Sequence, residues 1–566
     1  MKRIAIILSL AVACAGVGWA AYRGTAGPAP ESLSKFVPAG PLLYLEAKDF
    51  SALLHDWNSS AEKRAWIQSD NYEVFSRSRL LLRLKGAGEQ FAAAAGLPPD
   101  MDFLSQVAGE RSVLALYDIG KLQFLYITYL PSARSSETRL WQTRAKFEPR
   151  NAGGVDFYFR RDPESQREVA FAVSGDYLLL STREDLMAGA LQLMAGKQDR
   201  TVESESWWTE ATAASGKTGD LRMVLDLKTL VLNGYFRTYW VQQNITDLSQ
   251  YSAAVCDLFR SPKQYREERV LIRKKDLENA ASDDALTAVA DVSRLIPDNA
   301  GSYIAKASPT PEAVASVLET KLLMPHSGPV PISQFAPQVA LTSGEQGSSA
   351  DLETRIDQAP ASASESESAS VLKELLGKNL PLASLQVQTT DRDGAGVFVR
   401  MHSAIAVASS SDWDEATVES ALSEAIRPGL TASRLGVGWI QRSGYRQLDG
   451  LLPLCAAVRG KYLVVGDDSG LMESMLAKFS QKPTRAPLEL FAGFRHDRER
   501  GNFERFVRLI DRPAGASSEN GMREPQFFSG NMKSLSTTLS GVAAERIEVR
   551  SEGSKVRQTV NYEWSQ

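Results

Sequence analysis

The stretch AFAVSGDYLLLSTREDLMAGAL, residues 170–191, occurs a second time in the chain, and this repetition decides the fold. Residues 455–476, CAAVRGKYLVVGDDSGLMESML, align with it without a gap, so that glycine, tyrosine, leucine and methionine fall at the same places. Each copy contains two short apolar runs around a glycine, followed by a helical pattern. The sequence therefore predicts one strand–turn–strand–helix unit that is present twice.

Other segments recur in the same order along the chain. They are FVPAGPLLYLEAK from Phe36 with LIPDNAGSYIAKA from Leu295, which places Tyr44 opposite Tyr303; FLSQVAGERSVLAL from Phe103 with VLKELLGKNLPLASL from Val371; and REERVLIRKK from Arg266 with AERIEVRSEGS from Ala544. Short runs rich in β-branched and aromatic residues are typical of antiparallel strands. We therefore predict an α+β fold of two tandem related modules, each an antiparallel sheet with packed helices, preceded by an N-terminal membrane segment.

At 566 residues the chain is too long for one ordinary domain. The predicted organisation is a signal-anchor or signal peptide at 1–24, a tether at 25–35, a first α+β module at 36–276, a junction at 277–291 and a second α+β module at 292–566. Residues 343–370 lack aromatics and are rich in Ser, Ala and Glu, so they cannot bury enough apolar surface to order themselves. We predict that they form a disordered insertion in the second module.

Residues 4–21 form an uncharged apolar run that follows Lys2 and Arg3. A helix of this length rises by about 27 Å and just crosses the hydrocarbon core of a bilayer. The same residues are also compatible with a cleaved secretory signal ending near Ala20, or with a lipoprotein signal at Cys14. All three interpretations predict an extracytoplasmic protein. It is either a single-pass inner-membrane protein with a cytoplasmic N-terminus and a periplasmic bulk, or a periplasmic or secreted protein after cleavage.

The composition argues against several classes of protein. Lys and Arg number 64 and Asp and Glu 68, and no long basic run with interleaved aromatics is present, so nucleic acid is not an expected partner. Three cysteines exclude a disulfide framework, although one bond between Cys256 and Cys455 remains open. The four histidines are isolated, without H-E-x-x-H or C-x-x-C, so we expect neither a metal site nor a cofactor.

Three short motifs of serine penicillin-recognising enzymes occur in the sequence: S-x-x-K at Ser60 and Lys63, S-D-N at 69–71, and K-T-G at 217–219. In such enzymes the three motifs line one cleft from different elements. Here the first two fall in one local helix–turn–helix segment, so they cannot face each other across a pocket. We therefore predict no acyl-enzyme and interpret residues 69–71 as the N-cap of a helix that begins near Tyr72.

Four weaker patterns were weighed against simpler explanations. Residues 216–218 lack the upstream glycine of a phosphate loop and are interpreted as a polar turn, and residues 436–439 lack the third glycine of a dinucleotide fingerprint. Asp467 and Asp468 supply too few carboxylates for a calcium loop and are interpreted as helix-capping acids. The segment NGYFRTYWVQQN, residues 233–244, is either a surface that binds glycans or a partner, or an amphipathic helix with its aromatics in the core. No catalytic, cofactor-binding or metal-ligating residue is assigned.

The opening LLYLEAKD, the segment GDYLLLSTREDLM with its downstream helix, and the N-terminal apolar run together resemble a group of exported bacterial proteins known only as a domain of unknown function. The resemblance covers nearly the whole chain beyond the tether. It implies the extracytoplasmic location and a repeated α+β build, and it implies no activity and no catalytic residues.

These observations predict a membrane-anchored extracytoplasmic bacterial protein that acts by binding or scaffolding rather than catalysis. Its expected contacts are the inner membrane through residues 4–21 and a ligand or envelope protein in a cleft between the modules. The alternative is an exported hydrolase whose catalytic residues are dispersed along the chain. A cleft that holds an acid or base with a strongly perturbed pKa next to a serine or a second carboxylate would favour the hydrolase.

Overall fold

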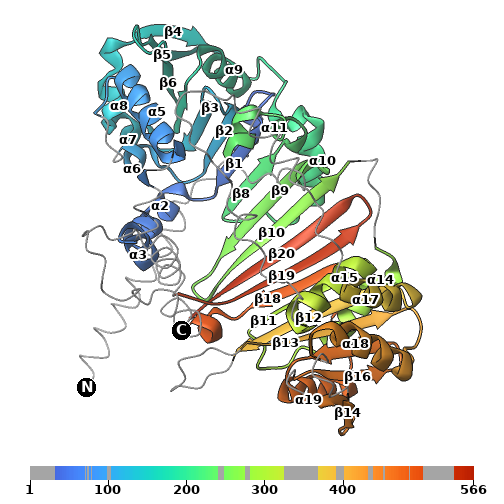
Figure 1. Cartoon of the computed structure of the whole chain (residues 1–566). Helices are drawn as coiled ribbons and strands as arrows, with labels where there is room; N and C mark the ends of the chain where they lie inside the picture. Colours follow the sequence, from blue (N-terminus) through green and yellow to red (C-terminus); the bar gives the residue numbers. More distant parts are fainter. Residues whose placement is uncertain are drawn as a thin grey trace, which may run out of the picture. The chain divides into compact units, whose positions relative to one another are not determined.

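The chain divides into two compact units. Unit 1 contains residues 1–64, 73–259 and 270–274, and unit 2 contains residues 65–72, 260–269 and 275–566. The structure, a computed structural model shown in Figure 1, describes residues 32–69, 72, 76–77, 79–98, 103–239, 248–274, 281–323, 367–390, 401–430, 438–449, 453–483, 485–500 and 541–565.

The strands of unit 1 pair in the order β4, β5, β6, β7, β3, β2, β1, β8, β9, and each of these pairings is antiparallel. Their bounds are β1 Leu43–Ala47, β2 Ser112–Asp118, β3 Gln123–Tyr129, β4 Glu148–Ala152, β5 Val155–Arg161, β6 Glu168–Ser174, β7 Tyr177–Ser181, β8 Leu221–Leu225 and β9 Tyr251–Arg260. The following strand, β10 (Gln264–Arg273), has residues in both units.

Helices cover both faces of the unit 1 sheet. The bounds of the helices in this unit are η1 Leu33–Phe36, α2 Phe50–Ser59, α5 Arg79–Ala95, α6 Phe103–Val107, α7 Ser132–Glu137, α8 Arg139–Gln142, η2 Arg144–Lys146, α9 Glu184–Met194, η3 Val202–Ser204, α10 Ser206–Ala214, α11 Leu227–Leu230 and α12 Gly234–Tyr239. α3 (Ala61–Ile67) has residues in both units. Local chemistry sets several helix starts. The Asp49 carboxylate, for example, accepts the Ala52 N–H at the start of α2.

The two faces of β6 show how the unit 1 core is built. Ala170 and Ala172 point into the cluster that contains Met187 of α9, whereas Val169 and Phe171 point into the cluster that contains the alanines at the end of α5. Because successive side chains of a strand point to opposite faces, a strand that is apolar at every position must be covered on both sides. Figure 1 shows α9 on one side of these strands and α5 with α8 on the other.

The strands of unit 2 pair in the order β14, β15, β16, β17, β13, β12, β11, β18, β19, β20, again with antiparallel pairings. Their bounds are β11 Ser302–Ala307, β12 Pro381–Thr390, β13 Met401–Ser409, β14 Gly438–Gln441, β15 Arg446–Asp449, β16 Cys455–Arg459, β17 Tyr462–Gly466, β18 Leu490–Phe494, β19 Val542–Glu552 and β20 Lys555–Trp564.

The helices of unit 2 also lie on both faces of its sheet. Their bounds are α14 Asp283–Ser293, α15 Pro311–Leu318, the π-helical turn η4 Glu319–Leu323, α17 Glu367–Lys378, α18 Glu415–Leu430, α19 Ser469–Ala477 and η7 Lys478–Ser480. One apolar cluster joins α14 and α19 to alternate residues of β11, β12 and β13. The other joins α15, α17 and α18 to the opposite face, which includes Ile405 and Val407 of β13.

The repeated stretch forms the predicted strand–turn–strand–helix unit in both places. β6, β7 and α9 make up the first copy, and β16, β17 and α19 make up the second. Val173 pairs with Leu178 in the first hairpin and Val458 with Leu463 in the second, the same register in both. The structure therefore confirms an α+β fold with antiparallel sheets. The relation between the two units as a whole stays a prediction at this point.

Several predicted boundaries differ from the structure. η1 lies partly in the predicted tether, because Leu33 is fully buried in the unit 1 core. α14 overlaps the predicted junction 277–291, since its alanines and valines form an apolar face that packs on the unit 2 sheet. α17 begins at Glu367, within the last residues of the predicted insertion 343–370, and the rest of that insertion lies outside the described residues.

The N-terminal segment, with the signal or anchor prediction for residues 1–24, lies outside the described residues. Among the helices that the structure does describe, none combines the length and the apolar character needed to cross a membrane.

Candidate functional site

The serines of the S-x-x-K and S-D-N motifs form hydrogen bonds with the backbone at helix ends. The Ser60 hydroxyl accepts the Lys63 backbone N–H at 3.0 Å, at the start of α3, and donates to the Trp57 carbonyl at 2.9 Å. The Lys63 ammonium donates to the Asn58 side chain instead of approaching Ser60. Ser69 accepts the Tyr72 N–H at 3.1 Å, as its predicted capping role requires. Residues 70 and 71 of the motif lie outside the described residues.

The K-T-G motif occupies a tight connection between α10 and β8. A Cβ atom at Gly219 would lie 2.5 Å from the Leu258 carbonyl oxygen, so only glycine fits there without a shift of backbone. The Gly219 N–H donates to Asp257 Oδ1 at 2.9 Å. This glycine therefore allows close packing of two backbone segments and supplies a hydrogen bond to a buried acid.

The acids Asp467 and Asp468, which directly follow β17, accept hydrogen bonds from different parts of the chain. Asp468 accepts the Leu471 N–H at 2.7 Å and caps α19, as predicted. Asp467 Oδ1 accepts the Ser403 N–H at 2.7 Å and lies 3.8 Å from Nδ1 of His402. Burial raises the pKa of Asp467 above its ordinary value. Burial, followed by the nearby acids, raises the pKa of the Cys455 thiol to about 11, so this thiol stays protonated at neutral pH and is a poor nucleophile.

The aromatic segment 233–244 is only partly described. Asn233 accepts the backbone N–H of Tyr235 at 3.0 Å and starts α12, and residues 240–244 lie outside the described residues. Tyr235 is largely exposed and Phe236 half-buried, so the described part presents aromatics to both solvent and protein.

In the segment 436–439, Gly438 and Trp439 belong to β14, and the Trp439 indole donates to Ser423 at 2.9 Å. Cys256 and Cys455 are both free thiols.

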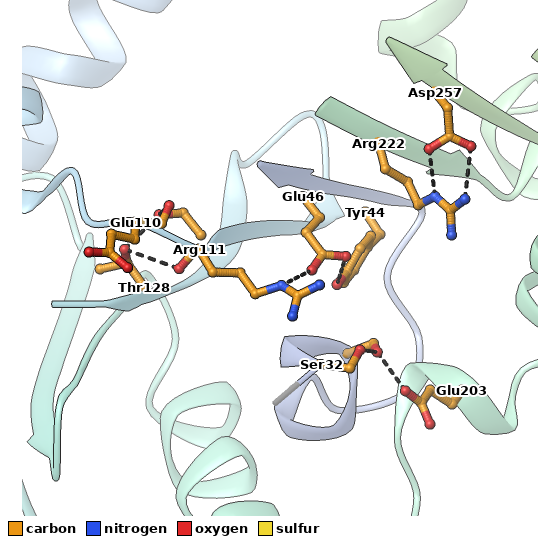
Figure 2. Close-up of polar contacts among 11 residues, drawn as sticks. Ser32, Tyr44, Glu46, Glu110, Arg111, Thr128, Glu203, Arg222 and Asp257 are labelled. Atoms are coloured by element: carbon orange, nitrogen blue, oxygen red, sulfur yellow. Dashed lines mark hydrogen bonds and ion pairs between the residues drawn. The ribbon is translucent and has the colours of Figure 1, made fainter. Parts of the chain in front are cut away.

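Unit 1 contains a row of alternating charges across three neighbouring strands, which we call the ionic ladder: Arg111, Glu46, Arg222 and Asp257. Glu46 pairs in register with Arg222, and Arg222 with Asp257. Arg111 Nε donates to Glu46 Oε1 at 2.8 Å. Figure 2 shows the Arg111 and Glu46 side chains meeting beside Tyr44, and Arg222 gripping Asp257 with two nitrogens.

The groups of the ionic ladder satisfy one another. Asp257, whose side chain is 2% exposed, accepts two bonds of 2.8 Å from Arg222 and one from Ser215, besides the bond from Gly219. Glu46 also accepts the Tyr44 hydroxyl at 3.1 Å. Burial, and then the Glu46 carboxylate, raise the pKa of Tyr44 well above its ordinary value, so the hydroxyl remains a donor. A network that is closed in this way specifies structure and leaves little hydrogen-bonding capacity for a ligand.

A hollow of about 600 Å³ lies along α9 in unit 1. Its lining includes Pro38 and Gly40, the ring of Tyr117, and Arg183 with Asp185 at the start of the helix. Part of its polar lining is used internally, since Arg183 and Asp185 form an ion pair and the Tyr117 hydroxyl donates to the Pro38 carbonyl at 2.7 Å. The exposed amides of Gln192 and Gln198 complete the polar lining.

A second hollow, of about 250 Å³, lies on the unit 2 sheet, and we call it the sheet hollow. It is lined by Ser302, Tyr303 and Ile304 of β11, Gln386, Val387 and Gln388 of β12, Ser403, Ala404 and Ile405 of β13, and Lys321 of η4. Ser302, Gln388 and Ser403 form one cross-strand row, and Ile304, Gln386 and Ile405 form the next. Side chains in paired positions share a face of a sheet, so both rows face the same side.

Three polar groups of the sheet hollow have no partner among the residues that the structure describes. Within the described residues, the ammonium of Lys321, the amide of Gln386 and the hydroxyl of Ser403 make no hydrogen bond or ion pair. Ser403 is only 9% exposed. The Ser403 hydroxyl is not one of the fully buried side-chain atoms that lack a partner, so it reaches the space of the hollow and can hydrogen-bond a molecule placed there. The sheet hollow is therefore the candidate functional site.

Sequence reasoning assigned none of these residues. Motif spacing finds groups that are close in the chain, whereas the sheet hollow collects side chains from β11, β12, β13 and η4. A usable signal was present in SLQVQTT, residues 384–390, where Gln386 and Gln388 alternate with apolar residues. Two amides at a spacing of two residues point to one face of a strand, and the mainly apolar neighbourhood makes them unusual.

Comparison with known proteins adds little to this description. No protein-family model matches the chain, and no curated protein matches it. Two solved structures match, crystal forms I and III of TP0453. They are 12% and 11% identical, cover 44% of this chain and 81% and 82% of theirs, and give TM-scores of 0.24 and 0.23. Likenesses at this level carry no argument about fold or function.

Proposed function

We propose that the chain is a membrane-anchored, extracytoplasmic bacterial protein that acts by binding, built from two related α+β modules. In this proposal residues 4–21 form the inner-membrane anchor, and the protein belongs to the exported group of unknown function that its sequence resembles. A cleaved signal with a periplasmic product is the variant of the proposal in which the anchor is lost.

The proposed relation between the modules is supported by their strand orders. In the order of pairing, nine strands of unit 1 correspond one by one to nine strands of unit 2. The unit 1 order is β4, β5, β6, β7, β3, β2, β1, β8, β9, and the unit 2 order is β14, β15, β16, β17, β13, β12, β11, β18, β19. The registers agree with the sequence repeat: Tyr44 pairs with Ala115 and Val224, and Tyr303 pairs with Val387 and Gly493. Many strand orders are compatible with antiparallel pairing, so the agreement of two orders of this length supports a relation between the modules.

The matched positions differ in polarity. Where unit 1 has Glu46 and Arg222 of the ionic ladder, the registers place Ala305 and Phe491 in unit 2, both fully buried in an apolar cluster. The same frame therefore forms with either a polar or an apolar interior at this place. We infer that polar groups at such positions are not required by the frame itself.

The sheet hollow carries the proposal of binding. It offers an ammonium, an amide and a hydroxyl without partners, and the structure describes no histidine or carboxylate among its lining residues. Hydrogen-bond donors that have no general base beside them suit the recognition of a ligand better than the activation of a nucleophile. The predicted cleft between the modules remains a further prediction for an envelope partner.

One observation favours the alternative, an exported hydrolase. Asp467 has a raised pKa and lies beside His402, which is the kind of acid–base pair that catalysis uses. Replacing His402 with Gln and assaying the protein against ester, amide and glycoside substrates tests this alternative. Hydrolysis that the substitution abolishes would replace binding by catalysis as the main function.

Fractionation of cells tests the proposed location. We expect the full chain in the inner-membrane fraction, with its bulk accessible to protease from the periplasmic side. Removal of residues 1–24 should release it into the soluble fraction. A full-length protein that is soluble and protected in the cytoplasm would refute the proposal.

A further inference from the structure

We propose that the sheet hollow binds a small organic anion with a hydroxylated body, such as a polyol phosphate or polyol carboxylate. The inference deepens the proposed binding function and rests on it. It assigns a ligand class to Lys321, Gln386, Gln388, Ser302 and Ser403, which no comparison assigns.

The charge of the ligand follows from Lys321. This lysine is exposed, has no partner in the described part of the chain, and stands on the π-helical turn η4 at the border of the hollow. π-helical turns are rare and occur frequently at functional sites. A lysine ammonium is a compact point charge that suits a phosphate or carboxylate group.

The hydroxylated body follows from the sheet face beneath. Gln386 and Gln388 project from the same face of β12, with Ser302 and Ser403 on either side of Gln388. Amides and hydroxyls donate and accept hydrogen bonds, so they match alcohol groups. The contact between Ser302 and Gln388 is 3.5 Å and that between Gln388 and Met401 Sδ is 3.6 Å, which are weak bonds that a ligand can replace.

The size of the ligand follows from the volume. About 250 Å³ corresponds to roughly eight water molecules at about 30 Å³ each, so the hollow accommodates a small molecule and not a polymer. Ile304 and Ile405 flank Gln386 and supply the apolar contact that a carbon skeleton needs.

The matched face of unit 1 shows that the polarity is not required by the fold. The corresponding rows there are Leu43, Leu116 and Phe124, and Leu45, Leu114 and Tyr126. Several of these side chains pack in the apolar cluster under α5 and α6. Unit 2 has instead polar side chains and an unfilled space at the same positions.

Calorimetric titration of the full chain tests the proposal. The probes are glycerol 3-phosphate, glycerate and neutral glycerol. We expect binding of one or both anions and none of glycerol. Binding of the phosphate alone or of the carboxylate alone identifies the charged group. Weaker binding at higher salt is expected, because the lysine is exposed.

Variants locate the site. Lys321→Met and Gln386→Leu should each weaken binding by about tenfold or more, as expected for the loss of a hydrogen bond to a charged or buried group. Lys306→Met is the matched control, since Lys306 is an exposed lysine on the same strand as Ile304 but does not line the hollow. Thermal unfolding checks that each variant is folded. The proposal is overturned if neither anion binds at millimolar concentration, or if Lys306→Met weakens binding as much as Lys321→Met. Fractionation is unaffected by these results, so the proposed location stands or falls separately.

Discussion

Replacing Asp257 with Ala should destabilise unit 1 far more than an ordinary surface substitution. The Asp257 side chain accepts four hydrogen bonds, and its removal leaves the Arg222 guanidinium, itself only 11% exposed, with Ser215 as its remaining described side-chain partner. Removal of one partner of a buried pair costs about 3–5 kcal/mol, because the other charge stays buried and uncompensated. We expect a loss in this range.

The double variant Arg222→Leu with Asp257→Leu tests the reason for that loss. Replacement of both charges by apolar side chains avoids the uncompensated charge, so the double variant should be more stable than Asp257→Ala alone. In the proposed relation between the units Arg222 corresponds to Phe491, which packs in an apolar cluster, in line with this expectation.

Urea titration with hydrogen exchange of peptides from β8 and β9 measures the effect in unit 1. The control is Arg550→Ala, which breaks the exposed pair with Glu548 in unit 2 and should cost less than about 1 kcal/mol. The reasoning fails if Asp257→Ala loses less than about 1 kcal/mol, or if the double variant is less stable than the single one.

Three further substitutions test individual residues. Gly219→Ala should destabilise unit 1 and increase exchange in β8, because its Cβ would meet the Leu258 carbonyl; normal exchange would contradict the close packing. Ser60→Ala should cost about 0.5–2 kcal/mol of local helix stability and leave the chain unlabelled by a fluorescent β-lactam, as the wild type should be; labelling at Ser60 would restore the acyl-enzyme hypothesis. The folded-state pKa of Asp467 is raised, so its contribution to stability is fully present below the ordinary Asp pKa and is lost as pH rises through the raised value. The unfolding midpoint of Asp467→Asn, relative to that of the wild type, should therefore rise as the pH increases from acid to neutral. A difference between the two midpoints that does not change with pH would refute the raised pKa.

Local patterns in the sequence predicted much of the secondary structure. SVLALYD in β2 and VDFYFRR in β5 are short runs rich in β-branched and aromatic residues, and the helical pattern of the first repeat copy is α9, because each depends on neighbouring residues alone. β4 was missed, since EPRNA is polar, contains proline and is exposed at four of its five positions. An edge strand of this kind is stabilised by its partner β5 and carries little signal of its own.

The weaker half of the repeat shows where sequence comparison fails. REERVLIRKK lies in β10, whereas AERIEVRSEGS lies in β19, and the pairing order places β9 opposite β19. Both segments are half-exposed strands rich in charged and aliphatic residues, so their similarity reflects shared composition rather than matched positions. The alignment around Tyr44 and Tyr303 agrees with the registers, because it contains a buried tyrosine in the centre of each sheet.

The ionic ladder and the sheet hollow both place polar side chains on a sheet, and they differ in whether these polar groups are satisfied. In the ionic ladder Glu46, Arg222 and Asp257 each have an opposite charge or a neutral hydrogen-bonding group within reach, so they contribute to stability and the loss of one is costly. In the sheet hollow the ammonium, amide and hydroxyl converge without satisfying one another, so an added molecule can gain hydrogen bonds that folding has left unmade. Residue type is visible in the sequence, but satisfaction depends on registers between strands that are distant in the chain. This is why the proposed site corresponds to no motif in the sequence.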